Sequence, residues 1–197
     1  LYLCQLRGMD KRDADKAVRE WFDRLNMSTW WNKKVEDLSK GMGQKLQFVT
    51  TVAHNPELLI LDEPFSGLDP VNANVLKDEI FRLAKEGTTI IFSTHRMEQV
   101  EEICDHIALV NLGQKVLDGK VNEIKHQYKE NIFKLAITNT NVPLPVGMNL
   151  VKEDGHNLYF KLDTAQQSND ILKHYLDHQA GIQQFEEVLP GLNDIFI

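Results

Sequence analysis

The sequence predicts an α/β fold with a parallel sheet, followed by a small α+β domain. Two strand-like runs, an aliphatic one at residues 58–61 and one of β-branched and aromatic residues at 88–92, end in polar or acidic residues, and a segment with helical periodicity separates them. Continuous apolar runs of this length are typical of strands covered on both faces of a parallel sheet. After residue 129 the alternation of strands and helices gives way to short strands and loops. We therefore expect domains at residues 1–129 and 130–197.

Three helices of the first domain are predicted by apolar residues that recur every three or four positions. Their expected N-caps are Asp10, Ser39 and Asp69. The apolar face of the first helix, residues 11–27, comprises Ala14, Val18, Trp21 and Leu25. The helix after Ser39 has Leu46, Val49 and Ala53 on its apolar face, and the helix after Asp69 has Leu76, Ile80 and Leu83. Pro70 in the first turn and Gly87 after the last residue are typical bounds for the third helix.

The remaining elements are shorter. Helices are expected at residues 96–104, 121–128, 169–178 and 192–196. Strands at residues 106–111 and 114–118 form a hairpin around Leu112 and Gly113. The second domain is expected to contain strands at residues 132–138, 157–162 and 183–188, a loop at 141–145 and a turn at 154–155.

Two adjacent carboxylates, Asp62 and Glu63, follow the first apolar run directly, and His95 follows the second. Ligands of parallel sheets lie at the carboxyl ends of the strands, so these side chains are placed where a nucleotide and its metal would bind. Many strands end in a solvated acid, and a histidine after a strand is often an ordinary loop residue. Each residue alone therefore leaves both interpretations open.

The segment at residues 38–45 predicts an anion site. Ser39 caps a helix, and Gly41 and Gly43 let a ligand approach the backbone. The free amides of the first turn and the positive end of the helix dipole favour a phosphate. An ordinary capped helix is the alternative for this segment taken by itself.

Together these segments resemble the nucleotide-binding subunit of an ABC (ATP-binding cassette) transporter. Residues 38–44 look like the signature motif, 58–63 like the Walker B strand, 66–69 like the D-loop, and His95 like the switch histidine. The resemblance covers residues 1–129 and implies a P-loop NTPase-like core with a helical subdomain. The family's common Leu-Ser-Gly-Gly-Gln is Leu-Ser-Lys-Gly-Met here, so Lys40 and Met42 replace a glycine and a glutamine.

The resemblance implies a role for each candidate site residue. Glu63 and His95 would be catalytic, and Asp62 would hold Mg²⁺. The residues that would bind ATP of an opposite subunit are Ser39, Lys40, Gly41, Met42 and Gly43. The D-loop residues that would lie along the dimer interface are Ser66, Gly67, Leu68 and Asp69. The implied partners are a second ABC ATPase subunit, expected to form a homodimer, and an integral membrane permease. The implied location is cytoplasmic, peripheral on the cytoplasmic face of the cell membrane.

The sequence has no Gly-x-x-x-x-Gly-Lys-Ser/Thr loop, the P-loop that holds nucleotide phosphates. We therefore expect an N-terminally truncated piece of a longer protein that is inactive alone. A natural protein without a P-loop would favour a non-enzymatic interaction module instead. A non-transport ABC-type ATPase that acts on ribosomes or DNA is a further alternative.

The composition fits this interpretation. The net charge is −7, which argues against a general nucleic-acid footprint. The two cysteines, Cys4 and Cys104, are far apart and lack metal-like partners, as in a reducing cytoplasm. The segment at residues 190–196 resembles the ending of an accessory domain found on bacterial drug-, sodium- and lipid-exporter ATPases. That domain carries no predicted chemistry, and His156, His174 and His178 are expected at its surface.

Overall fold

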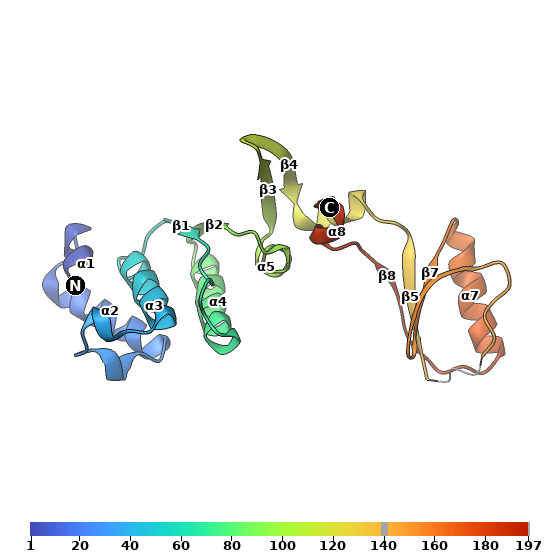
Figure 1. Cartoon of the computed structure of the whole chain (residues 1–197), viewed down its shortest axis with the longest axis horizontal. Coiled ribbons are helices and arrows are strands. Elements are labelled where there is room, and N and C mark those ends of the chain that lie inside the picture. Colours follow the sequence, from blue (N-terminus) through green and yellow to red (C-terminus); the bar gives the residue numbers. More distant parts are fainter. Residues whose placement is uncertain (139–141, 197) are drawn as a thin grey trace. The chain divides into compact units, whose positions relative to one another are not determined.

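The structure is a computed structural model that describes residues 1–138 and 142–196 (Figure 1). The chain divides into two compact units, Leu1–His95 and Arg96–Ile197. Helices and strands alternate from α3 to β3, and the two strands of the first unit are parallel, as the predicted α/β class requires. The domain boundary expected between residues 129 and 130 lies within the second unit and stays a prediction.

The first unit contains four α-helices and two parallel strands among its described residues. The helices are α1 (Tyr2–Leu6), α2 (Lys11–Arg24), α3 (Lys40–Val52) and α4 (Pro70–Lys85), with 3₁₀ turns η1 (Ser28–Trp30) and η2 (Val35–Asp37) before α3. The strands are β1 (Leu58–Asp62) and β2 (Thr89–Ser93). Helix α1 was not predicted, and α2 ends three residues earlier than expected because Asn26 adopts a positive φ of 56°.

The predicted caps and apolar faces of the long helices are confirmed. The Asp10 carboxylate accepts the amides of Arg12 and Asp13, and that of Asp69 accepts the amide of Asn72. These bonds satisfy amides that have no partner within the helix. The predicted apolar residues of α2 and α4 are buried, as are Val49 of α3 and Ala53 at its C-cap, whereas Leu46 of α3 is half-buried.

Strands β1 and β2 pair in parallel, with Leu58 opposite Thr89 and Asp62 opposite Ser93. The prediction that both strands are covered on both faces is wrong for this chain, and Ile91 of β2 is 55% exposed. Leu59 and Leu61 are buried, whereas Leu58 is 50% exposed and Ile60 67% exposed. Successive side chains of a strand point to opposite faces, and the described residues cover only one face of β1.

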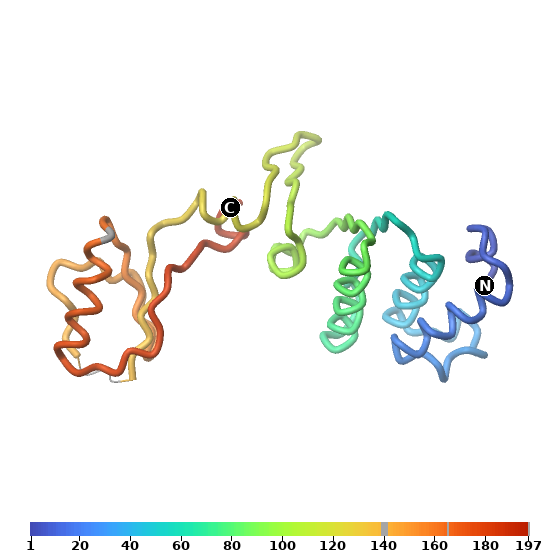
Figure 2. Tube along the Cα trace, turned by 180° about the vertical axis from the view of Figure 1, so that it is seen from behind, coloured from blue at the N-terminus to red at the C-terminus, as the bar shows by residue number. Residues whose placement is uncertain are grey.

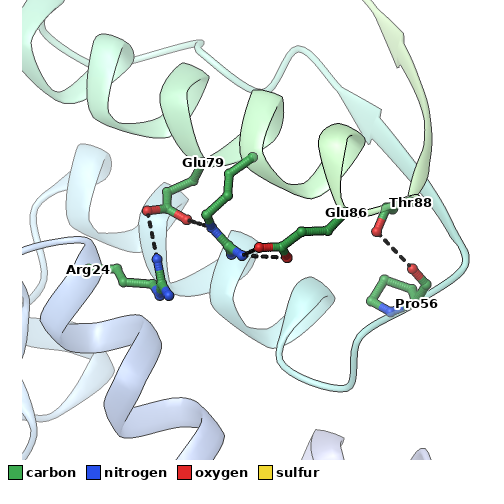
Figure 3. Close-up of polar contacts among 6 residues, drawn as sticks. Arg24, Pro56, Glu79, Glu86 and Thr88 are labelled. Carbon is green, nitrogen blue, oxygen red and sulfur yellow. Dashed lines mark hydrogen bonds and ion pairs between the residues drawn. The ribbon is translucent and has the colours of Figure 1, made fainter.

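Ion pairs and a hydrogen bond connect elements of the first unit (Figure 3). Arg24 of α2 pairs with Glu79 at 3.5 Å, and Glu79 also pairs with Arg82 at 2.8 Å. The hydroxyl of Thr88 donates to the carbonyl of Pro56 at 3.3 Å, which ties the segment before β2 to the segment before β1. The helices and the two strands thus form one packed unit that carries the strand ends.

The second unit begins with α5 (Met97–Ile103) and a hairpin. Strands β3 (His106–Asn111) and β4 (Gln114–Lys120) form the predicted antiparallel hairpin around Leu112 and Gly113, which both have positive φ. Helix α6 (Val121–Gln127) follows directly. Ile107, Val121, Ile124 and Leu192 form a small core, which brings α8 (Leu192–Phe196) back onto α5 and α6.

The rest of the unit is a four-stranded antiparallel sheet in the order β6-β7-β5-β8. Its strands are β5 (Ile132–Ile137), β6 (Asn149–Asp154), β7 (Asn157–Lys161) and β8 (Ile182–Val188). Helix α7 (Ala165–Asp177) packs against it, around a core that includes Leu135, Phe160 and Tyr175 (Figures 1 and 2). Residues 142–145 of the predicted loop are irregular, and Asn141 lies outside the described residues.

Strand β6 was not predicted. It is an edge strand that pairs only with β7, and its register shifts between Leu150 and Lys152. The shift interrupts the alternation of apolar and polar residues that identifies a strand in a sequence. Helix α7 begins four residues earlier than predicted, at a capping box of Thr164 and Gln167.

Candidate functional site

Asp62 and Glu63 lie at the carboxyl end of β1, where the strand gives way to a tight turn. The amide of Glu63 donates to the Ser93 carbonyl at 3.0 Å, the last bond between the two strands. Glu63 adopts a positive φ of 43°, which is uncommon for a residue with a side chain. The amide of Ser66 then donates back to the Glu63 carbonyl at 3.0 Å and closes the turn. The backbone therefore turns sharply at the second carboxylate.

The Glu63 carboxylate is held by the end of β2. Its Oε1 accepts the amide of His95 at 3.0 Å and lies 2.6 Å from His95 Nδ1, while its Oε2 accepts the Thr94 hydroxyl at 3.2 Å. Partial burial alone would raise the pKa of Glu63, but the hydrogen bonds and charge of His95 and the bond from Thr94 outweigh it, so the pKa is lowered. Glu63 is consequently ionised at neutral pH.

Asp62 has a different environment from its neighbour. Its side chain is exposed, and its Oδ1 accepts the hydroxyl of Ser93, the residue opposite it in the parallel register. Asp62 also borders a shallow hollow lined in part by Gln44 and Thr51 of α3. An exposed carboxylate beside a hydroxyl offers the hard oxygen ligands that Mg²⁺ prefers.

The signature segment forms the N-terminus of α3, as predicted. The Ser39 hydroxyl accepts the amide of Met42 at 3.3 Å. Ser39 is exposed and Gly41, Met42 and Gly43 are half-buried, so the first turn is open at its N-terminal end. Unpaired amides and the helix dipole at such an end attract anions.

The same helix contacts the loop that follows Glu63. The side-chain amide of Gln44 donates to the Pro64 carbonyl at 3.4 Å. A Cβ atom added to Gly41 would lie 3.4 Å from the Gly67 carbonyl oxygen, so the two backbones are in close contact. Phe65 between them is buried and packs edge-on against Phe92.

Lys45 is the one buried charged side chain among the described residues. Its ammonium donates to the Leu25 carbonyl at the end of α2, at 2.9 Å. Burial lowers the pKa of Lys45, and the carboxylate of Asp69 partly opposes that effect. Lys45 therefore joins the signature helix to α2 and lies near enough to the D-loop to interact with its charge.

The structure thus gathers the predicted site residues into two groups. Asp62, Glu63 and His95 meet where the two strands end. The signature turn and residues 64–69 form the other group. Sequence reasoning missed Ser93 and Thr94, whose hydroxyls bind the two carboxylates. No local sequence signal identifies them, because the pairing depends on the parallel register that places Ser93 opposite Asp62.

Comparison with known proteins identifies the family. The chain is 42% identical, over its whole length, to an uncharacterized ABC transporter ATP-binding protein, YhaQ, of Bacillus subtilis, and spans 66% of that protein. It is 38% identical, again over its whole length, to an uncharacterized ABC transporter ATP-binding protein of Alkalihalophilus pseudofirmus, and spans 74% of it. The chain belongs to the ABC transporter ATP-binding proteins.

A solved structure of the ABC family supports the fold. The structure of an ATP-binding subunit of an ABC transporter matches 64% of this chain and 53% of its own, with a TM-score of 0.60 and 25% identity. This likeness confirms the P-loop NTPase-like fold class.

Two family models match parts of this ABC protein. Residues 119–197 match the C-terminal domain of DrrA1-3-like ATP-binding proteins, which supports the accessory domain expected from residues 190–196. Residues 29–100 match a model described as an AAA domain, putative AbiEii toxin, type IV TA system. Among the described residues, no helix has the length and apolar character needed to cross a membrane.

Proposed function

We propose that this chain supplies the hydrolytic and signature elements of an ATPase that drives transport through a membrane permease. The observation that carries the proposal is the Glu63 carboxylate, ionised and held by His95 at the end of a parallel strand. Such a carboxylate can accept a proton from a water molecule that attacks the γ-phosphate. Family membership supports ATP as the nucleotide.

Asp62 is the proposed Mg²⁺ ligand, with Ser93 beside it. Among the described residues no group of three or more His, Cys, Asp or Glu side chains is placed to hold a metal ion. An ion at Asp62 would therefore take most of its ligands from water and from the nucleotide, as Mg²⁺ commonly does. Bound Mg²⁺ would neutralise charge on the phosphates.

His95 has two roles in this proposal. Its Nδ1 is engaged with Glu63 and orients that carboxylate. Its Nε2 is then the ring nitrogen that remains available for a phosphate oxygen or the attacking water. The side chain is 79% exposed, so a nucleotide can reach it.

The signature turn is proposed to bind the ATP of a second subunit. The proposed contact is made by the backbone at the capped N-terminus of the 13-residue helix α3, over residues Ser39, Lys40, Gly41, Met42 and Gly43, and does not require the charge of Lys40. Ser66, Gly67, Leu68 and Asp69 would lie along the interface between the subunits, because Gly41 and Gly67 are in contact within one chain. The P-loop that would hold the nucleotide's phosphates is a motif that this sequence does not contain.

The proposed partners are a second ABC ATPase subunit, in a homodimer, and an integral membrane permease on whose cytoplasmic face the dimer would lie. ATP binding would favour the closed dimer and hydrolysis would release it, which moves the permease between two access states. The net charge of −7 gives no support for a nucleic-acid partner.

The test is ATP hydrolysis by the full-length protein that contains this chain. Glu63→Gln should reduce kcat by about 10²-fold or more and leave ATP binding nearly unchanged, because the carboxylate acts on water. Asp62→Asn should act through Mg²⁺ and raise the Mg²⁺ concentration required. Glu57→Gln, an exposed acid just before β1, is the matched control. Turnover near wild type in Glu63→Gln would remove Glu63 from its proposed role.

A further inference from the structure

Lys40 lies across the D-loop of its own chain. A Cβ atom added to Gly67 would be 2.8 Å from Cε of Lys40, 3.0 Å from its Cδ and 3.3 Å from its Cγ. Gly67 itself has a φ of 77°, a conformation that glycine adopts without strain. The aliphatic stem of Lys40 therefore packs directly on the bare backbone at Gly67.

Neighbouring residues of α3 contact the same loop. Gly41 approaches Gly67 and Leu68, and the Gln44 amide donates to the Pro64 carbonyl. Positions 40, 41 and 44 lie on one face of a helix, since residues four apart are neighbours on its surface. The start of α3 thus contacts both ends of the turn that leads away from Glu63.

Within the described part of the chain, the Lys40 ammonium has no hydrogen-bond or ion-pair partner, and the side chain is exposed. The contact with Gly67 is made by the methylene groups. Long cationic side chains commonly pack their stems on a surface and leave the charged end in water. The geometry therefore assigns the contact to the stem and not to the charge.

We propose that Lys40 is a positioning residue that couples the signature turn to Glu63 of the same chain. The inference rests on the proposed function, in which the signature turn binds the ATP of a second subunit. Gly67 follows Glu63 by four residues, and the bond from the Ser66 amide to the Glu63 carbonyl joins them in one turn. A nucleotide that moves the signature turn would move Lys40, then Gly67, and then the backbone that carries the hydrolytic carboxylate.

Hydrogen exchange in the full-length, nucleotide-free protein tests the contact without any need for hydrolysis. The amides of Ser66 and Leu68 donate to Glu63 and Phe65, and their protection reports the order of the turn. Lys40→Ala, which removes the stem, should accelerate exchange at both amides. Lys40→Met keeps an unbranched stem without the charge, so exchange at both amides should stay as slow as in the wild type. Lys33→Ala, at an exposed lysine outside the site, is the control. Unchanged exchange in Lys40→Ala would overturn the proposal.

Steady-state kinetics test the coupling. Lys40→Ala should lower kcat by about two- to thirty-fold, the range seen for residues that carry coupling between sites, and should reduce the Hill coefficient for ATP toward 1. The KM for ATP should change less than kcat, and Lys40→Met should restore both kcat and the Hill coefficient. A Lys40→Met variant as defective as Lys40→Ala, with a raised KM, would assign Lys40 to nucleotide binding by charge and overturn the proposal.

A double-mutant cycle with Gly67→Ala completes the test. The added methyl group would displace the Lys40 stem and would also strain the backbone at a φ of 77°, so Gly67→Ala should have a clearly smaller additional effect in the Lys40→Ala background than in the wild type. Additive effects would contradict the coupling. Absence of ATP hydrolysis in the wild-type full-length protein would refute the proposed function, and the exchange experiment would still decide whether Lys40 orders the turn.

Discussion

The carboxylate of Glu63 is bound to both the backbone amide and the ring of His95, just beyond the last paired residues of two parallel strands, Asp62 and Ser93. These bonds join the two residues proposed for hydrolysis before any nucleotide is present. They also fix the protonation state of the carboxylate, because they favour its charged form.

His95→Ala should therefore raise the pKa of Glu63 toward its ordinary value of 4.5. The bond and charge of the ring would be lost, while the bond from the residue-95 amide would stay. Carboxyl ¹³C shifts during a pH titration measure this change. Ser93→Ala is the control, since the Ser93 hydroxyl binds Asp62. A pKa of Glu63 that is equal in both variants would show that the ring does not stabilise the carboxylate.

The sign of the pH dependence follows from the lowered pKa of Glu63. The interaction contributes its full stabilisation above the unfolded pKa, near 4.5, and loses it as the pH falls through the lower folded value. Exchange at the His95 amide, which donates to Glu63, should accelerate in that acid range relative to amides of α4.

Parts of this site could be predicted because they depend on local sequence. The aliphatic run before Asp62 and the pair Asp69 and Pro70 each determine a strand end or a helix start, and both predictions are confirmed. The positive φ of Glu63 and the contact of Lys40 with Gly67 depend on how distant segments pack, and no local pattern records them. Exposure of Ile60 was missed for the same reason, since a sequence run cannot show which face has a neighbour.

Lys45→Met should destabilise the first unit by about 1–3 kcal/mol, the cost of a buried acceptor left without its charged donor. The Lys45 ammonium is 2.9 Å from the Leu25 carbonyl, and the residue is only 6% exposed. Urea denaturation followed by tryptophan fluorescence would measure the loss, since Trp21 lies in this unit's core. Lys33→Met, at an exposed position, should be neutral, and equal stability of both variants would contradict the role of the buried bond.

Glu101 anchors the terminal helix α8 to α5. Its Oε1 accepts the Leu192 amide at 2.5 Å, and its Oε2 pairs with Lys125 at 2.5 Å. Burial alone would raise the pKa of Glu101, but the bonds from Lys125 and Leu192 and the charge of Lys125 lower it. The contact between Glu101 and α8 should thus be intact at neutral pH. Its stabilisation should begin to fall below pH 4.5, the ordinary pKa of a glutamate, and should be lost as the pH passes through the lower pKa of Glu101 in the folded protein.

Glu101→Ala should release α8 at neutral pH and accelerate hydrogen exchange at the amide of Leu192. Lys125→Met should have a smaller effect, because the bond to the Leu192 amide remains. The acid-dependent rise in exchange should be absent from Glu101→Ala. If that rise persisted, another carboxylate would be responsible.

Tyr175 carries a buried hydroxyl without a hydrogen-bond partner among the described residues. The side chain is fully buried in the core beneath α7. Tyr175→Phe keeps the ring and removes the unpaired hydroxyl, so it should stabilise the unit by about 1 kcal/mol or leave it unchanged. Tyr175→Ala should cost about 3–5 kcal/mol through the cavity it creates. Thermal unfolding of both variants measures the contrast, and a clear loss in Tyr175→Phe would reveal a partner for the hydroxyl.

The 197-residue chain by itself should bind Mg-ATP no more tightly than about millimolar, roughly −4 kcal/mol. Most affinity for a triphosphate in this class comes from P-loop amides and a P-loop lysine, and the sequence contains no such motif. The capped end of α3 alone would contribute only about 0.3–1 kcal/mol at an exposed position. Calorimetry with Mg-ATP tests this, with Ser39→Ala and Asp62→Asn as comparison variants. Micromolar binding that disappears in either variant would mean that the signature turn and the end of β1 hold the phosphates by themselves, and the division of the site between subunits would have to be abandoned.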